Sequence, residues 1–123
     1  MDEQEFKKRT KLLALRIIKL VSSLPKNTVS DVIGKQLVRS GTSVGANYRS
    51  ACRARSTADL IAKLRILEEE ADECLYWMEL IVEAKLVDAT NLRSIMSETN
   101  EILAMTVASI KTLMARNPIG NRK

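Results

Sequence analysis

The sequence predicts an all-α protein, an antiparallel up-down-up-down bundle of four helices, from three observations. Apolar residues recur at steps of three and four positions through four long segments, which is the spacing of one helix face. The links between these segments are short, so neighbouring helices must run antiparallel. The 123 residues include only 4 Gly and 2 Pro, too few for the many turns of a β-sandwich or barrel. We therefore expect residues 1–123 to form a single four-helix domain.

The first two expected helices cover residues 3–24 and 30–54. Pro25 ends the first helix, because proline cannot continue it. Ser30 has a residue type that caps helix N-termini, so we place the start of the second helix there. The apolar faces are formed by Phe6, Leu13, Ile17, Leu20 and Leu24 in the first helix and by Ile33, Leu37, Val44, Tyr48 and Ala51 in the second.

The third and fourth expected helices cover residues 57–86 and 90–116. Ser56 is a suitable N-cap for the third helix, with Asp59 placed as in a capping box. Residues 117–120 contain a proline and a glycine, which end the fourth helix. The third helix has the alternating four- and three-residue steps of a bundle seam at Leu60, Leu64, Leu67, Ala71, Cys74, Met78 and Ile81.

Some helices carry more apolar residues than one seam needs. A helix that is apolar over much of its circumference requires a second surface to bury it. Two interpretations remain open, namely a wide core within one bundle or an interface between copies of the chain. In the third helix the additional apolar residues are Ile61, Ile66, Leu75, Trp77, Leu80 and Val82.

The composition excludes several kinds of chemistry. The chain has no histidine, which removes the commonest general base and the commonest metal ligand. The two cysteines, Cys52 and Cys74, exclude a cysteine-rich zinc site, and their offset of roughly 24 Å along the bundle excludes a disulfide. A magnesium site at Glu69, Glu70 and Glu73 has no second acidic helix to complete it. We therefore expect no enzyme activity, no metal and no cofactor.

The chain contains no run of 18 apolar residues, so we expect no transmembrane span. Its first residues are acidic, whereas the first residues of a signal peptide are basic. We therefore place the protein in the cytoplasm, where both thiols stay reduced.

A polar network is predicted at mid-height between the second and third helices. If their hairpin turns near Arg55, Arg39 lies opposite Ala71, within a run of carboxylates. The planar fork of arginine matches carboxylate geometry, so the two should pair there. The network either locks the two helices together or forms a functional polar site. Its expected members are Arg39, Asn47, Glu69, Glu70 and Glu73.

Basic residues gather on the first helix and at the end of the second, whereas the third helix is acidic. The net charge of +5 and the pI near 9.4 permit a polyanionic partner. The basic residues form either solvated faces with inter-helix ion pairs or a surface for phosphates. Aromatic residues make up only 3%, too few to stack single-stranded bases. The candidate phosphate contacts are Lys7, Lys8, Arg9, Lys11, Arg49, Arg53 and Arg55.

Gly41 and Gly45 lie four residues apart in the second helix, beside Ser40 and Ala46. Because glycine in a helix interior costs about 1 kcal/mol relative to alanine, this spacing indicates close approach of another helix. A phosphate-binding P-loop is not indicated, since no strand precedes these glycines and no lysine follows Gly45.

Residues 36–49 of this chain read QLVRSGTSVGANYR. This segment resembles the signature of a bacterial family of four-helix bundle proteins, which are encoded by intervening sequences of large-subunit ribosomal RNA genes. The third helix of that family is similar to residues 61–64, 68–73 and 76–80. The resemblance covers nearly the whole chain, and its specific part is the run RSGTSVGAN.

This resemblance implies a left-handed up-and-down bundle that assembles as a ring-like homopentamer without enzyme activity. It also implies that the ribosomal name often given to such proteins reflects where their genes lie. A related branch consists of accessory proteins of diversity-generating retroelements, which are basic and pentameric and bind nucleic acid and a reverse transcriptase. We therefore expect a homo-oligomer that binds structured RNA or another polyanion. The alternative is a scaffold that docks a protein partner such as a reverse transcriptase.

Overall fold

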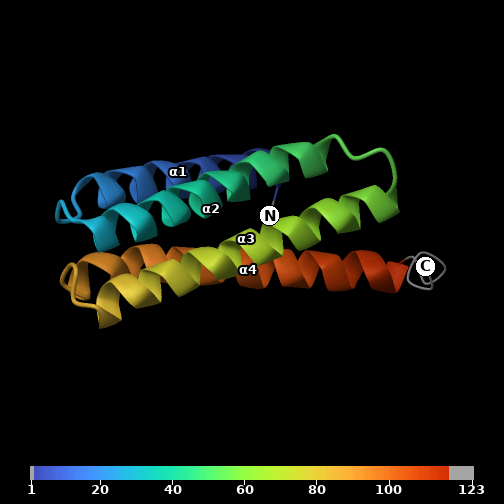
Figure 1. Cartoon of the computed structure of the whole chain (residues 1–123). Coiled ribbons are helices and arrows are strands. Elements are labelled where there is room, and N and C mark those ends of the chain that lie inside the picture. The colour runs from blue at the N-terminus through green and yellow to red at the C-terminus, as the bar shows by residue number, and fades with distance from the viewer. Residues whose placement is uncertain (1, 117–123) are drawn as a thin grey trace.

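Four helices make up the computed structural model, which describes residues 2–116 (Figure 1). They are α1 (Glu3–Ser22), α2 (Thr28–Cys52), α3 (Thr57–Glu83) and α4 (Thr90–Arg116). Each helix packs against the next one in the chain, whereas α1 and α4 touch at few positions. Successive helices run in opposite directions, as Figure 1 shows. The prediction of an all-α, antiparallel four-helix bundle is confirmed.

Side-chain caps determine where α2 and α3 begin. The start of α2 lies two residues before the predicted one, because the N-cap is Asn27, whose side-chain oxygen accepts a hydrogen bond from the N–H of Ser30 at 2.8 Å. Ser56 caps α3 as predicted and accepts from the N–H of Asp59 at 3.0 Å. The Asp59 carboxylate accepts in turn from the N–H of Arg55 at 3.1 Å. This second bond fixes the α2–α3 turn against the first turn of α3.

The first three helices end two or three residues before their predicted ends. After α3, Lys85 adopts a left-handed backbone with a φ of 57°. Its N–H bonds to the carbonyl of Val82 at 3.0 Å, and that of Leu86 bonds to the carbonyl of Ile81 at 3.1 Å, which is a Schellman ending. Such endings usually contain glycine, so the lysine gave no signal that the helix stops. The end predicted for α4 at residues 117–120 lies outside the described residues.

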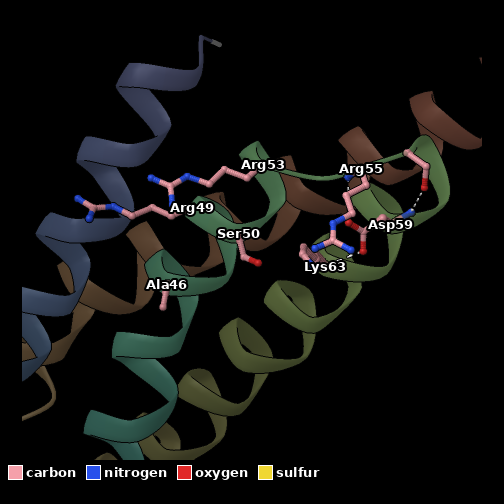
Figure 2. Close-up of a pocket in the computed structure, with 8 residues that line it drawn as sticks. Ala46, Arg49, Ser50, Arg53, Arg55, Asp59 and Lys63 are labelled. Carbon is pink, nitrogen blue, oxygen red and sulfur yellow. Dashed lines mark hydrogen bonds and ion pairs between the residues drawn. The ribbon is translucent and has the colours of Figure 1, made fainter.

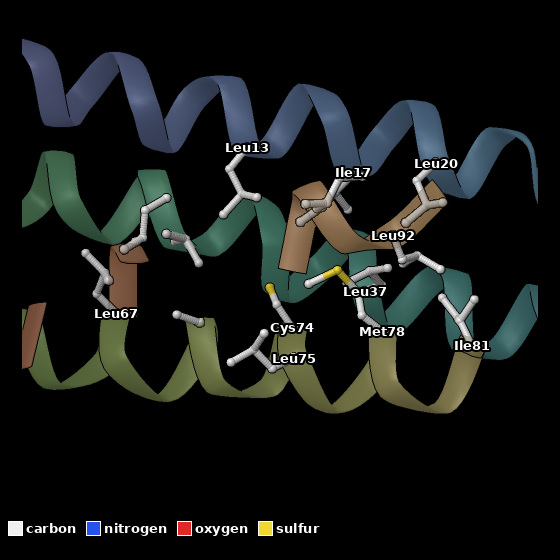
Figure 3. Packing of buried hydrophobic residues seen from close by; sticks show 14 of the residues in the cluster. Leu13, Ile17, Leu20, Leu37, Leu67, Cys74, Leu75, Met78, Ile81 and Leu92 are labelled. Carbon is white, nitrogen blue, oxygen red and sulfur yellow. The ribbon is translucent and has the colours of Figure 1, made fainter. Parts of the chain in front are cut away.

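The apolar core extends along the bundle between all four helices (Figure 3). The predicted seam of α3 is buried from Leu64 to Ile81, while Leu60 packs at its edge. No helix within residues 2–116 is long and apolar enough to cross a lipid bilayer. The large side chains with no exposed surface include Leu13, Ile17, Leu37, Leu67, Met78, Leu92 and Ile102.

A wide core accounts for most of the surplus apolar residues of α3. Leu75 is buried, and the others except Ile66 are half-buried against the core. Ile66 is 43% exposed. Ile66 is one of seven large apolar side chains within residues 2–116 that stay exposed in a single copy. These seven are Leu12, Leu15, Ile18, Val29, Val32, Ile66 and Tyr76.

The small residues of α2 allow α1 to approach closely, as predicted. A Cβ atom at Gly41 would lie 2.6 Å from Cδ1 of Ile17, and one at Gly45 would lie 3.3 Å from Oγ1 of Thr10. Ile17 and Thr10 are both buried. The two glycines therefore leave the space that these α1 side chains fill.

Both cysteines are free thiols, as the predicted offset requires. Cys74 is buried in the core, and its thiol donates to Oγ of Ser40 at 3.4 Å. Burial raises the pKa of the Cys74 thiol to about 11. Cys52 is half-buried at the end of α2.

Candidate nucleic-acid interface

A hollow of about 920 Å³ opens where α2 ends and α3 begins (Figure 2). Four of its lining side chains are cationic, and the only acidic one is Asp59. We call this site the arginine hollow. Its lining residues are Ala46, Arg49, Ser50, Arg53, Arg55, Ser56, Asp59 and Lys63.

The end of α2 supplies two of these cations. Arg49 and Arg53 are one helical turn apart, about 6 Å along the axis. In Figure 2 both side chains extend from α2 toward the side of α1 and away from Arg55. Arg53 is the C-cap residue, and its N–H bonds to the carbonyl of Ser50 at 3.1 Å. The C-terminal end of a helix carries a partial charge of about −0.5, which favours cations there. This partial charge is smaller than the two positive charges of the arginines, so the helix end stays positive.

The turn after α2 and the beginning of α3 supply the other two cations. Arg55 lies in the turn, and its N–H donates to Asp59. Nζ of Lys63 lies 3.2 Å from Oδ1 of the same carboxylate. These interactions lower the pKa of Asp59, with the Arg55 N–H contributing most. The lining therefore contains four cations and one carboxylate, and the hollow carries net positive charge.

A second hollow of about 320 Å³ lies between α1 and α2, and we call it the lysine groove. It shares Ala46 and Arg49 with the arginine hollow, so the two sites adjoin each other. The close approach of the helices at Gly45 brings Lys7 and Lys11 of α1 to the same groove as Arg49. The lysine groove is lined by Lys7, Thr10, Lys11, Ala14, Thr42, Gly45, Ala46 and Arg49.

Most of the predicted phosphate contacts come together at these two sites. Lys8 is exposed on α1 outside both. Arg9 faces α4, where Nη2 lies 2.6 Å from Oε1 of Glu98 and 3.2 Å from Oε1 of Glu101. The bond to Glu98 contributes most to a raised Arg9 pKa. Arg9 therefore links α1 to α4 and is not part of the basic surface. The predicted contacts that line the two sites are Lys7, Lys11, Arg49, Arg53 and Arg55.

Lys63 belongs to the arginine hollow but was not among the predicted contacts. Most other charged residues of α3 are acidic, so the sequence did not indicate a cationic site on this helix. Its place four residues after Asp59 is the signal that could have identified it, because residues four apart share a helix face. Asp59 itself is tied to the turn that carries Arg55.

The polar network between α2 and α3 is centred on Arg39, at the height that the hairpin register predicts. Nη1 of Arg39 lies 3.1 Å from Oε2 of Glu70, and Nη2 bonds to Oε1 of Glu73. Nε1 of Trp77 donates to the same Glu73 oxygen at 3.1 Å. Arg39 is the main cause of a lowered Glu73 pKa. The charges of this cluster are thus paired with one another.

Two residues expected in the network lie outside it. Glu69 is exposed and makes no hydrogen bond or ion pair within residues 2–116. Nδ2 of Asn47 donates to the carbonyl of Ser43 at 2.8 Å, so this amide bonds within its own helix and does not lock α2 to α3. No group of three or more Cys, Asp or Glu side chains in the described part of the chain could hold a metal ion.

Fold and surface together define a basic four-helix bundle protein with two adjoining hollows lined by cations. Residues 2–108 match the family model of the 23S rRNA-intervening sequence protein, and the chain belongs to this family. A protein of unknown function from the S23 ribosomal protein family of Bacteroides thetaiotaomicron has a similar crystal structure, with a TM-score of 0.83 and 37% sequence identity. The match covers 90% of this chain and 99% of that one. No curated protein matches the chain.

Proposed function

We propose that this protein is a non-enzymatic, homo-oligomeric cytoplasmic protein that binds structured RNA through the arginine hollow and the lysine groove. The observation that carries the proposal is that six cations line two adjoining hollows that share Arg49. The single carboxylate lining them, Asp59, is already paired with Lys63. Such a surface neutralises phosphates and gains free energy from the counterions that they release.

The RNA backbone, not its bases, is the proposed point of contact. Within the described residues, no aromatic side chain lines either hollow, so unpaired bases have no stacking platform. The guanidinium forks of Arg49, Arg53 and Arg55 suit phosphate oxygens. The cations come from α1, α2, the turn and α3, so they cover a broad face. A folded RNA presents several neighbouring phosphates to a face of that breadth.

Assembly of several copies would multiply this surface, and we favour the pentamer that the sequence resemblance implies. Leu12, Leu15, Val29, Val32 and Tyr76 are each more than half exposed in a single copy. Contacts between copies would bury these side chains and gain free energy by removing them from water. Several weak phosphate sites in one assembly bind one RNA with higher apparent affinity than any single site.

The test is the variant Arg49→Glu/Arg53→Glu/Arg55→Glu. Its binding to a labelled RNA hairpin is measured by fluorescence anisotropy between about 50 and 200 mM salt. We expect weaker binding and a salt slope that is smaller by about 3, one for each lost phosphate contact. The matched control, Lys26→Glu/Arg93→Glu/Lys111→Glu, makes the same charge change at exposed residues outside both hollows and should bind nearly as the wild type does.

Circular dichroism at 222 nm establishes that each variant is folded. Unchanged RNA affinity of the hollow variant would overturn the proposal. An equal loss of affinity in the control would also overturn it, because net charge alone would then explain the binding.

The alternative function is a scaffold that docks a protein partner such as a reverse transcriptase. It is favoured by an aromatic pair on α3, in which the rings of Tyr76 and Trp77 lie 5.1 Å apart edge to face and Tyr76 is 53% exposed. Tyrosine and tryptophan are enriched among residues that dominate protein interfaces. A partner held by such apolar contacts keeps its affinity over the salt range in which RNA binding weakens.

A further inference from the structure

The outward face of α1 carries exposed apolar side chains between two lysines. Leu12, Leu15 and Ile18 are 54%, 55% and 43% exposed. Lys8 precedes Leu12 by four residues, and Lys19 follows Leu15 by four, and both lysines are exposed. The steps of four, three and four place Lys8, Leu12, Leu15 and Lys19 along one line of the helix surface. We call these four residues and Ile18 the α1 strip.

The outward face of α3 repeats this spacing with the opposite charge. Asp72, Tyr76, Glu79 and Glu83 also follow one another at steps of four, three and four, and all four are exposed. Tyr76 is 53% exposed, and the half-buried Leu80 lies beside Glu79. We call these five residues the α3 strip.

The two strips match in length, and the charges at their ends are opposite in sign. Lys8 and Lys19 are eleven residues apart, as are Asp72 and Glu83, which corresponds to about 17 Å in each helix. Among residues 2–116, no ion pair or side-chain hydrogen bond engages any of these four charged groups. Each strip has the same sign of charge at both ends. The end charges can therefore pair whether α1 of one copy lies parallel or antiparallel to α3 of the other. Between its charged ends the α1 strip is apolar, whereas the α3 strip has Tyr76 and Leu80 together with a third carboxylate, Glu79.

We infer that the α1 strip of one copy docks on the α3 strip of a second copy. Contacts between identical strips are disfavoured, because they would set lysines against lysines or carboxylates against carboxylates. The complementary surface is present on the chain itself, which identifies the occupant of each strip as another copy. This inference deepens the assembly part of the proposed function and does not depend on RNA binding.

The position of the strips determines what kind of assembly results. Both α1 and α3 pack against α2 and α4 and thus occupy opposite corners of the bundle. Each copy therefore offers one strip to one neighbour and the other strip to a second neighbour. A repeated contact of this kind closes into a ring or continues as a filament.

Two charge-reversal variants test the docking. Lys8→Glu/Lys19→Glu makes the α1 strip acidic, and Asp72→Lys/Glu83→Lys makes the α3 strip basic. By size-exclusion chromatography with light scattering, the wild type should have several times the chain mass of 13.8 kDa. Each variant alone should have the mass of a monomer. An equimolar mixture should form a larger species that contains both, because each reversed strip complements the other variant.

The matched control for the charge reversals is Lys26→Glu/Lys111→Glu, at exposed lysines outside both strips, which should keep the wild-type mass. A monomeric wild type would overturn both the assembly and the docking. An assembled wild type whose mass neither variant changes, or a mixture without a joint species, would overturn the docking and leave the assembly standing. An assembled wild type that the two variants disrupt as expected, but that does not bind the RNA hairpin, supports the docking and overturns RNA binding alone.

Discussion

Replacing Gly41 by alanine should destabilise the bundle, although the same change at an open helix position stabilises a protein. The gain in helix propensity is about 1 kcal/mol. Against it, a Cβ atom at Gly41 would lie 2.6 Å from Cδ1 and 3.1 Å from Cγ2 of Ile17. Ile17 is completely buried, and its branched Cβ restricts rotation about χ1. Rotation about χ2 can move Cδ1, but χ1 fixes Cγ2, and the filled core around Ile17 leaves little room for either methyl group to shift.

The size of the effect follows from these contacts. Overpacking a filled core costs about 1–3 kcal/mol, and contact with both branches of one residue places Gly41→Ala in the upper half of that range. After subtraction of the propensity gain, the free energy of unfolding should fall by about 1–2 kcal/mol. At Gly45 the nearest atom, Oγ1 of Thr10, lies at 3.3 Å and needs to shift only slightly. Gly45→Ala should therefore change stability by no more than about 0.5 kcal/mol.

Urea unfolding followed by circular dichroism at 222 nm measures both variants. The protein concentration is held fixed, because assembly stabilises the folded state by mass action. We expect a lower midpoint for Gly41→Ala with an unchanged m-value. The change Ile17→Val removes Cδ1 and should cost less in the Gly41→Ala background than in the wild type, where about 0.5–1.5 kcal/mol is typical. If Gly41→Ala is as stable as the wild type, the packing argument is refuted.

Three further changes probe side chains outside the basic surface. Arg9→Ala should lower the free energy of unfolding by about 1 kcal/mol in urea, because it removes a half-buried ion pair, and should leave RNA affinity unchanged in anisotropy. Iodoacetamide at about pH 8 should modify Cys52 before Cys74, whose burial raises its pKa to about 11, and equal rates by peptide mass spectrometry would contradict this. Arg39 lowers the pKa of Glu73, so the stabilisation from this carboxylate is present at neutral pH and is lost as the pH falls through the lowered pKa. As the pH is lowered, the urea midpoint of Glu73→Gln should therefore fall less than that of the wild type.

The helices could be predicted because their apolar periodicity extends over many turns, whereas their ends depend on single residues. Asn27 and Ser30 are both good N-caps, and only the structure shows that Asn27 caps α2. The end of α3 depends on Lys85 in a left-handed conformation, which its residue type does not indicate. Periodicity thus predicts that a helix exists more reliably than it predicts where the helix stops.

The sequence predicted how far along the bundle the site residues lie, but not which direction each side chain faces around its helix. A short turn fixes the antiparallel register of α2 and α3, so Arg39 could be placed beside the carboxylates of Glu70 and Glu73. Consecutive residues rotate by about 100° around a helix, so neighbouring basic residues of α1 face different directions. Arg9 faces Glu98, which is 89 residues away in the sequence. Nothing near Arg9 in the sequence reveals that partner.

Closure of the strip-to-strip contact into a ring would have a consequence for RNA binding. Rotation about one axis keeps equivalent atoms at the same height, so the arginine hollows of all copies would form a single band of cations. Docking leaves this band open, because no residue of either strip lines the hollow. Several hollows would then engage one folded RNA together, and the monomeric Lys8→Glu/Lys19→Glu should bind the hairpin less tightly than the assembled Lys26→Glu/Lys111→Glu, which has the same change in charge. If Lys8→Glu/Lys19→Glu is monomeric but binds as tightly as Lys26→Glu/Lys111→Glu, the band does not contribute to RNA affinity.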